Sequence, residues 1–232
     1  MNKQKSIEEA IAEIQSGSVI MVGGFGSPGT PFTLIDELLA QGQNNLTIIK
    51  NDANEQCLGI SKLIENQRVK KLVTTHIGLN KYVVDLKNSG ELIVNFHPQG
   101  ILAEKIRVAG SGCFGFLSDI GIETEITEDN QLVEWKGRTL KIEEPLNADF
   151  ALLHAHQADH YGNLRYQGSA MNFSPLMAMA ADNVIVETPN LLLPGDIEPD
   201  SVHTPSAFVS SVIALQKLSS EYGLMEGRFE NQ

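Results

Sequence analysis

Residues 16–31 read SGSVIMVGGFGSPGTP, and the helix-like run FTLIDELLA follows at 32–40. The apolar, β-branched stretch at 19–22 is typical of a buried strand, and four glycines follow it within seven residues. Thr30 and Pro31 then offer an N-cap and a first-turn proline for the next helix. This order of strand, glycine loop and helix predicts an α/β fold in which backbone amides approach an anionic ligand, because glycine adopts positive φ and a helix N-terminus favours negative charge.

The glycine loop alone does not identify a ligand. No Gly-Lys-Ser or Gly-Lys-Thr follows the glycines, so a phosphate loop of the NTPase kind is not indicated. Since glycine loops are common in turns, a tight strand-to-helix connection without a ligand is the alternative. The rest of the sequence has to distinguish the two.

The charge of the chain limits its partners. The chain has 17 basic and 29 acidic residues, a formal net charge of −12, and 42% hydrophobic residues. Nonspecific nucleic-acid binding needs a basic surface, so we expect no nucleic-acid partner. An anionic ligand needs local donors, such as loop amides, to offset the overall negative field.

The length and the N-terminus indicate domain organisation and location. At 232 residues the chain is long enough for one large domain, and we expect a single domain over 1–218 with a flexible tail over 219–232. Residues 1–10, MNKQKSIEEA, have no apolar core of signal-peptide length, and no run approaches the length of a membrane span. We therefore expect a soluble cytoplasmic protein that does not contact a membrane.

Strand and helix patterns alternate along most of the chain. The expected helices lie at 7–14, 31–41, 57–66, 80–89, 98–108 and 175–182. The expected strands lie at 19–22, 46–50, 69–78 (a strand with its loop), 92–96, 149–156 and 183–188, with a last apolar run at 208–215. Such alternation predicts a mostly parallel open sheet covered by helices on both faces.

The segment 111–145 has a different composition. Glycines are frequent where it begins, and LVEWKGRTLKI at 132–142 is typical of a β-hairpin. We expect this segment to form a small antiparallel β excursion at the edge of the main sheet.

Parallel sheets bind ligands at the carboxyl ends of their strands. The loops that follow the expected strands, and are therefore candidates for a site, lie at 23–30, 51–54, 76–80 and 97–100. Asn51 leads the second loop, and Gln99 lies in the first turn of a helix, where its amide can point into a site. Because Asn and Asp also cap helices and tolerate left-handed backbone, each polar loop residue has a purely structural interpretation as well.

The chain carries no evident catalytic motif. Its six histidines lack metal-ligand spacing, so we expect no metal site. Cys57 and Cys113 are isolated, and we interpret them as buried or half-buried thiols. No Gly-x-Ser-x-Gly turn is present, and Glu104 lies three residues before Arg107, the spacing of an ion pair on a helix surface. The sequence thus offers polar loops for an anion but no nucleophile of its own.

Ordered landmarks between residues 5 and 215 resemble one family. They are SGSVIMVGGFGSPGTP (16–31), THIGLN (75–80), SGELIVNFHPQGILAEKIRVAGSG (89–112), EPLNADFALLHAHQADHYGNLRY (144–166), MNFSPLMAMAAD (171–182) and PDSVHTP (199–205). With these landmarks the chain resembles the alpha subunits, also named A subunits, of family I 3-oxoacid or acetoacetate/butyrate–acetate CoA-transferases. The sugar-phosphate isomerases, which share a related fold, are the alternative enzyme class.

The resemblance implies ping-pong acyl transfer. A glutamate carboxylate attacks an acyl-CoA thioester to give an acyl-glutamyl anhydride and CoA thiolate, the thiolate forms an enzyme–CoA thioester, and an acceptor acid reverses the sequence. In the family this glutamate lies on a beta subunit, so we expect the chain to be inactive alone and to work in an α2β2 complex. Coenzyme A is then a substrate, no cofactor is tightly bound, and acetoacetate, butyrate, succinate and acetate are the expected acids.

The resemblance also implies site residues, because the family's glycine motif is associated with CoA binding. The residues carried over are Gly23, Gly24, Phe25, Gly26, Ser27, Pro28 and Gly29. Asn51, Gln99 and Gly100 are expected to line the shared site.

Three departures from the family pattern concern the expected site. Met171 stands where the family has an arginine, Ser174 replaces an asparagine, and SDIGIET at 118–124 differs from a T-P-T-G-x-G-T-like loop. These changes leave the acyl specificity open. They also motivate a further hypothesis, a non-catalytic chain that binds CoA without turnover.

Overall fold

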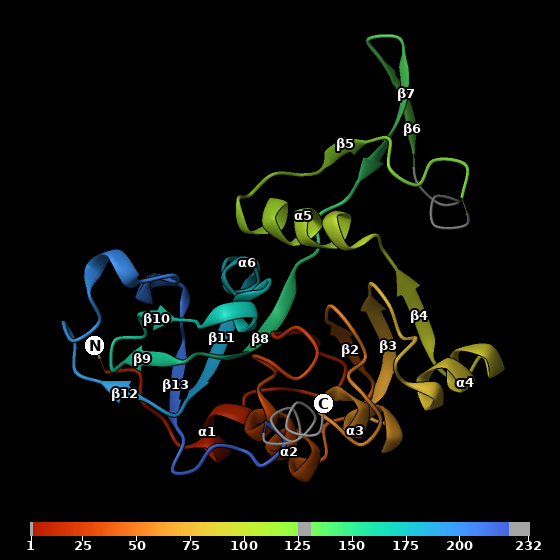
Figure 1. Ribbon diagram of the computed structural model, residues 1–232. Helices are drawn as coiled ribbons and strands as arrows, with labels where there is room; N and C mark the ends of the chain where they lie inside the picture. Colours follow the sequence, from red (N-terminus) through yellow and green to blue (C-terminus); the bar gives the residue numbers. More distant parts are fainter. Residues whose placement is uncertain (1, 125–130, 223–232) are drawn as a thin grey trace, which may run out of the picture.

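The computed structural model describes residues 2–124 and 131–222, and a seven-stranded sheet forms the centre of this part (Figure 1). Its strands are β1 (Val19–Val22), β2 (Leu46–Ile49), β3 (Val69–Thr74), β4 (Ile93–Phe96), β8 (Ala148–His154), β11 (Ala181–Thr188) and β13 (Ser211–Ala214). They lie in the order β13-β11-β8-β1-β2-β3-β4, and every neighbouring pair is parallel. The expected α/β fold with a mostly parallel sheet is confirmed.

Helices cover both faces of the sheet, as expected (Figure 1). One face carries α1 (Ile7–Ile11), α2 (Phe32–Gln41), α3 (Ile60–Glu65) and α4 (Lys81–Ser89), and the other carries α5 (Gln99–Gly110) and α6 (Ser174–Ala180). Each face therefore has its own hydrophobic core, which explains why the strands are apolar without alternation. In the part of the chain described, no helix has the length and apolar character needed to cross a membrane.

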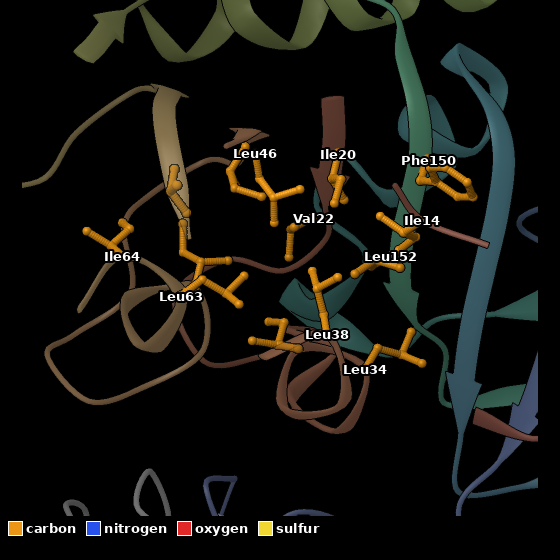
Figure 2. Packing of buried hydrophobic residues seen from close by; sticks show 14 of the residues in the cluster. Ile14, Ile20, Val22, Leu34, Leu38, Leu46, Leu63, Ile64, Phe150 and Leu152 are labelled. Atoms are coloured by element: carbon orange, nitrogen blue, oxygen red, sulfur yellow. The ribbon is translucent and has the colours of Figure 1, made fainter. Parts of the chain in front are cut away.

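Strand β1 contributes to both cores. Ile20 and Val22 belong to the core beneath α2, where Leu34 and Leu38 lie beside them (Figure 2). Met21, between them in sequence, belongs to the opposite core. All five side chains are fully buried. Because truncating such a side chain to alanine costs about 2–5 kcal/mol, β1 and α2 hold both ends of the loop that joins them firmly in the fold.

The described residues 111–124 and 131–145 form an arm that stands apart from the main sheet (Figure 1). Its described strands are β5 (Phe116–Ser118), β6 (Leu132–Trp135) and β7 (Arg138–Glu143), which pair antiparallel. The expected antiparallel excursion and its hairpin are confirmed, but they form a sheet of their own, so the expected place at the edge of the main sheet is wrong. The arm carries open apolar side chains, since Phe114 is 97% exposed and Trp135 57%.

A second small sheet was not expected from the sequence. Strands β9 (Gln157–Asp159) and β10 (Leu164–Arg165) form an antiparallel pair around residues 160–163, and β12 (Leu191–Leu192) adds to β9 in parallel. Strands of two or three residues are too short to show a periodic pattern, so the sequence contains no signal for them.

The start of α2 corrects one expectation. The helix begins at Phe32 with Pro31 in the N-cap position, so Pro31 is not a first-turn residue and Thr30 is not the cap. The Thr30 hydroxyl instead donates to the carbonyl of Gly26 at 2.6 Å. The side chain that was expected to begin the helix thus closes the glycine loop.

Both cysteines also differ from expectation. Cys57 and Cys113 are exposed free thiols, so the interpretation as buried or half-buried residues is wrong. Cys57 has a φ of +64° in the turn before α3, and Cys113 lies in the loop that leads from α5 into the arm. Turns and loops run over the surface, and a small apolar side chain there does not enter a core.

The last described residues fold back onto the body of the protein. The Tyr222 hydroxyl donates to the carbonyl of Thr30, and Glu221 pairs with Lys62 of α3. These contacts lie within the expected flexible tail over 219–232. For the rest of that segment, which is outside the described residues, flexibility stays a prediction.

A cluster of buried charges lies where the arm meets α5. Lys105 Nζ donates to Glu143 Oε2 at 3.0 Å, and Lys141 Nζ lies 2.7 Å from Glu143 Oε1. All three residues are buried, and two ammonium groups share one carboxylate. Burial, followed by repulsion from Lys105, lowers the pKa of the nearby His97 to about 4.

Acidification is expected to destabilise the fold through His97. Its pKa falls from 6.5 to about 4 on folding, so protonation favours the unfolded chain and stability is lost as the pH drops from 6.5 towards 4. We expect a loss of about 2 kcal/mol, allowing for partial exposure of the ring. Urea unfolding at pH 7 and pH 4.5 measures it, and His97→Gln should lose less stability than the parent. An equal loss in both proteins would contradict this role.

Candidate functional site

Three loops at the carboxyl edge of the sheet surround one pocket of about 390 Å³. Residues 25–28 follow β1, residues 52–55 follow β2, and His76, Ile77 and Leu79 follow β3. Ser169, from the short helix η2 (Gly168–Met171), completes the wall. Three of the four loops predicted to carry the site therefore meet at one place. The fourth, 97–100, does not line the pocket.

Glycine is required in the first loop for its backbone shape. Gly24 has a φ of +99°, and a Cβ atom there would lie 2.5 Å from the amide nitrogen of Thr30. Phe25 N donates to Pro28 O at 2.9 Å, and Thr30 N donates to Ser27 O at 3.1 Å, so the loop folds into two successive turns. The loop therefore has a fixed shape before any ligand binds.

Glycines at both ends of the loop allow a second segment to approach. A Cβ atom on Gly29 would lie 2.4 Å from the carbonyl oxygen of Ala170, and one on Gly23 would lie 2.8 Å from Ser174 Oγ. The backbone of Ala170 and the side chain of Ser174 thus lie directly against the glycine loop. Of the predicted ligand-binding residues, Phe25 to Pro28 line the pocket, while Gly23, Gly24 and Gly29 shape it.

Asp52 holds the loop in place from the neighbouring strand end. Its carboxylate accepts from the amide of Gly26 at 2.8 Å, from the amide of Asn54 at 2.9 Å and from the side chain of Asn51 at 3.1 Å. Asn54 Nδ2 in turn donates to the carbonyl of Gly26 at 2.9 Å. The loops after β1 and β2 are therefore linked through both backbone groups of one glycine.

Lys50 supplies the opposite charge for Asp52. Its side chain is wholly buried, and Nζ lies 3.4 Å from both carboxylate oxygens of Asp52. Burial lowers the pKa of Lys50 and acts to raise that of Asp52. For Asp52 the attraction of Lys50 and the hydrogen bonds outweigh burial, so its pKa lies below the usual value. Asp52 is thus a fixed anion whose oxygens are already engaged.

The two remaining predicted side chains of the site lie beside this network. Gln99 Nε2 donates to Asn51 Oδ1 at 2.7 Å, so the first turn of α5 is tied to the loop after β2. Asn51 is buried, whereas Gln99 and its neighbour Gly100 are exposed. The structure brings Asn51 and Gln99 together and leaves Gly100 open at the start of the helix.

A second buried network lies beneath the start of α2 and was missed in the sequence. Glu187 Oε2 accepts from the amide of Leu34 at 2.9 Å, and Glu187 Oε1 lies 3.0 Å from His154 Nδ1. Burial raises the pKa of Glu187, although the contact with His154 acts the other way. His154 and Glu187 are register partners near the carboxyl ends of β8 and β11. Alignment of the expected strands NVIVET (183–188) and ALLHAH (151–156) as neighbours could have indicated this contact.

The histidines that are close in sequence do not gather at one point in the fold. Within residues 2–124 and 131–222, no three His, Cys, Asp or Glu side chains are grouped so that they could hold a metal ion. His154 pairs with Glu187, and the carbonyl of His156 accepts from Asn190.

The family model for coenzyme A transferases matches residues 4–215, which is nearly the whole chain. The chain belongs to the coenzyme A transferase family. This membership confirms the resemblance seen in the sequence and decides against the sugar-phosphate isomerase alternative.

Relatives of this transferase chain are named as alpha or A subunits. The alpha subunit of a probable coenzyme A transferase of Bacillus subtilis (strain 168) is 44% identical over 91% of this chain and 93% of its own length. The alpha subunit of acetate CoA-transferase of Escherichia coli (strain K12) is 42% identical over 93% of this chain and 98% of its own. The A subunit of 3-oxoadipate CoA-transferase of Pseudomonas putida is 42% identical over 91% of this chain and 92% of its own length. The chain is therefore a CoA-transferase chain of the alpha type.

Solved structures support the fold. An acyl-CoA transferase of Escherichia coli O157:H7 matches with a TM-score of 0.82 at 24% identity, over 96% of this chain and 48% of that one. Glutaconate coenzyme A-transferase of Acidaminococcus fermentans matches with a TM-score of 0.82 at 20% identity, over 91% of this chain and 75% of that one. The decarboxylase AibA/AibB matches nearly as well, with a TM-score of 0.81 at 23% identity, over 100% of this chain and 94% of that one. Since a decarboxylase shares it, the fold by itself does not specify the reaction.

The departures from the family pattern lie in two different places. Met171 ends η2, the helix that brings Ser169 to the pocket, and is 38% exposed. The segment 118–124 belongs to the arm and does not line the pocket. Only the change around Met171 and Ser174 therefore borders the glycine loop and the pocket.

Glu104→Gln is expected to leave transfer within about twofold of the parent. Glu104 accepts two hydrogen bonds from Arg107, at 2.9 Å and 2.7 Å, on the surface of α5, and these bonds lower its pKa. A carboxylate held by a guanidinium on the solvent-facing side of a helix is a poor nucleophile, so its loss should not stop the reaction. Steady-state CoA transfer by the assembled enzyme measures this. A near-complete loss of transfer would instead mean that this chain supplies the nucleophile.

Proposed function

We propose that this chain forms the CoA-binding half of an active site shared with a beta subunit. A glutamate on that partner chain attacks the acyl-CoA thioester, giving an acyl-glutamyl anhydride and CoA thiolate. The thiolate then attacks the glutamyl carbonyl of the anhydride, which forms a glutamyl-CoA thioester and releases the acyl group as a free carboxylate, and an acceptor carboxylate takes CoA by the reverse steps. The acids are short-chain carboxylates such as acetate, butyrate and acetoacetate, and the assembly is a cytoplasmic α2β2 complex.

The state of Asp52, one of two carboxylates in the pocket wall, supports the proposal that the nucleophile comes from another chain. This carboxylate lies in the pocket wall, but its oxygens accept from two backbone amides and one asparagine and face Lys50. A carboxylate that is needed to hold the loop cannot also form and release an anhydride. The alpha and A names of the relatives agree with a second chain as the source.

We propose that amides of the glycine loop receive the charge that develops during transfer. In the described part of the chain, the amides of Gly24, Ser27 and Gly29 donate to no protein acceptor. Fixed donors of this kind stabilise an oxyanion without reorganisation and are worth several kcal/mol in acyl transfer. Residues 23–29 thereby bind CoA, and Asn51, Gln99 and Gly100 line the edge that faces the partner.

CoA transfer from acetoacetyl-CoA to acetate tests the proposal. The chain is assayed alone and co-expressed with a beta-type subunit from the same genome. Activity only in the mixture supports the shared site, and activity of the chain alone overturns it. A stable complex that binds CoA but transfers nothing would favour the non-catalytic alternative, for which the change at Met171 is the motivating observation.

A further inference from the structure

The pocket beside the glycine loop has a mainly apolar wall. Phe25 and Pro28 contribute from the glycine loop, Ala53 from the loop after β2, and Ile77 and Leu79 from the loop after β3. Phe25 is 45% exposed and Leu79 is 71% exposed, so large apolar side chains stand open at the rim. Such a wall favours a ligand that replaces its contact with water by contact with carbon.

The charged groups in this wall are carboxylates. Asp52 and Glu55 line the pocket, and the lining contains no lysine or arginine among the residues that the structure describes. The ammonium of Lys50 is near, but Lys50 is wholly buried and paired with Asp52, so it is not open to the cavity. His76 is the one imidazole among the described lining residues. A second negative charge that enters this pocket therefore meets a mainly apolar wall, with no lysine or arginine among the described lining residues to pair with it.

We infer that the pocket holds the acyl chain and selects monocarboxylic acids with neutral, apolar chains over dicarboxylic acids. This inference rests on the proposed function, since it assigns the acyl group to the pocket beside the CoA-binding loop. A distal carboxylate placed here loses its water without gaining a partner, whereas a methyl group in the same place gains apolar contact. The names of the relatives do not settle the point, because acetate and 3-oxoadipate enzymes are equally similar at 42% identity.

Butyrate and succinate are the matched pair for the test, because both have four carbons and differ only in the distal group. The co-expressed complex transfers CoA from acetoacetyl-CoA to each acid at pH 8, well above the range in which histidine side chains ordinarily titrate. We expect kcat/KM for butyrate to exceed that for succinate at least about tenfold. A ratio near one, or a preference for succinate, overturns the inference.

Leu79 offers a gain-of-function test. Because this side chain is 71% exposed, a polar replacement does not disturb a core. Leu79→Lys places a cation at the rim, and Leu79→Gln is the matched control without charge. Both variants should lose butyrate transfer, and only Leu79→Lys should raise succinate transfer, by roughly tenfold relative to butyrate. An equal effect of the two variants would mean that the distal group lies elsewhere.

A separate binding measurement distinguishes failure of this inference from failure of the proposed function. Butyryl-CoA and succinyl-CoA compete with a fluorescent CoA analogue for the complex, which requires no turnover. If no acid accepts CoA, the proposed function fails, and the competition still decides the preference of the pocket. Tighter binding of butyryl-CoA supports the inference, and equal or weaker binding overturns it.

Discussion

Gly24→Ala is expected to weaken CoA binding by the assembled enzyme about tenfold or more and to reduce transfer further. An added Cβ atom would lie 2.5 Å from the Thr30 amide nitrogen and 2.7 Å from Thr30 Oγ1, and the φ of +99° is unfavourable for any residue with a side chain. The backbone must move to relieve this contact, and the loop amides move with it. Calorimetric titration of the complex with CoA measures the change.

Gly17→Ala is the matched control for this variant. Gly17 also has a positive φ, +89°, but a Cβ atom there meets nothing within 4 Å and the residue lies before β1. It should lose about 1 kcal/mol of stability and keep its CoA affinity. If Gly24→Ala bound CoA as tightly as the parent, the assignment of the glycine loop to CoA would be wrong.

Asp52→Asn is expected to have the largest effect on folding, a loss of about 3–5 kcal/mol in the free energy of unfolding. The substitution leaves the buried ammonium of Lys50 without its counter-charge and turns an acceptor for the Gly26 and Asn54 amides into a group that also donates. Urea unfolding at pH 7 measures the loss. Because the pKa of Asp52 is lowered on folding, its contribution is present above the unfolded pKa and disappears as the pH falls through the folded value.

The double variant Lys50→Met/Asp52→Asn separates the charge effect from the loop effect. It removes both charges, so it should be more stable than Asp52→Asn alone while still lacking the carboxylate that holds the loop. CoA affinity should then stay low although stability partly returns. If the stability loss of the double variant equalled the sum of the losses of Lys50→Met and Asp52→Asn, the two side chains would not be coupled.

The fold could be predicted because local pattern and global arrangement agree. The run at 19–22 is apolar at every position, and the structure shows the reason: Ile20 and Val22 enter one core and Met21 the other. Strands that are apolar at every position and alternate with helices are compatible with few folds other than a parallel sheet covered by helices on both faces. The ends of the strands, and with them the loops of the pocket, followed from the same pattern.

The partners of individual side chains could not be predicted in this way. Glu187 accepts from the amide of Leu34, which is 153 residues away in sequence, and no local pattern records such a contact. The position of Thr30 before a helix predicts a cap, but in the folded chain its hydroxyl donates to the Gly26 carbonyl instead. The hydrogen-bond partner of a polar residue is set by the tertiary structure, so the local sequence does not predict it. For an apolar residue of a strand, the sequence has to predict only the face of the sheet on which it packs.

The strand order has a consequence for synthesis of the chain on the ribosome. One neighbour of β1 is β2, which follows soon after it, but the other is β8, which begins at residue 148. Until β8 emerges, the nascent chain carries an apolar central strand with one unpaired edge, a template for pairing with other chains. The bridge between Gln4 and Val212 can close only when the last strand is made. We therefore expect newly made chains to depend on chaperones for most of the time that translation takes.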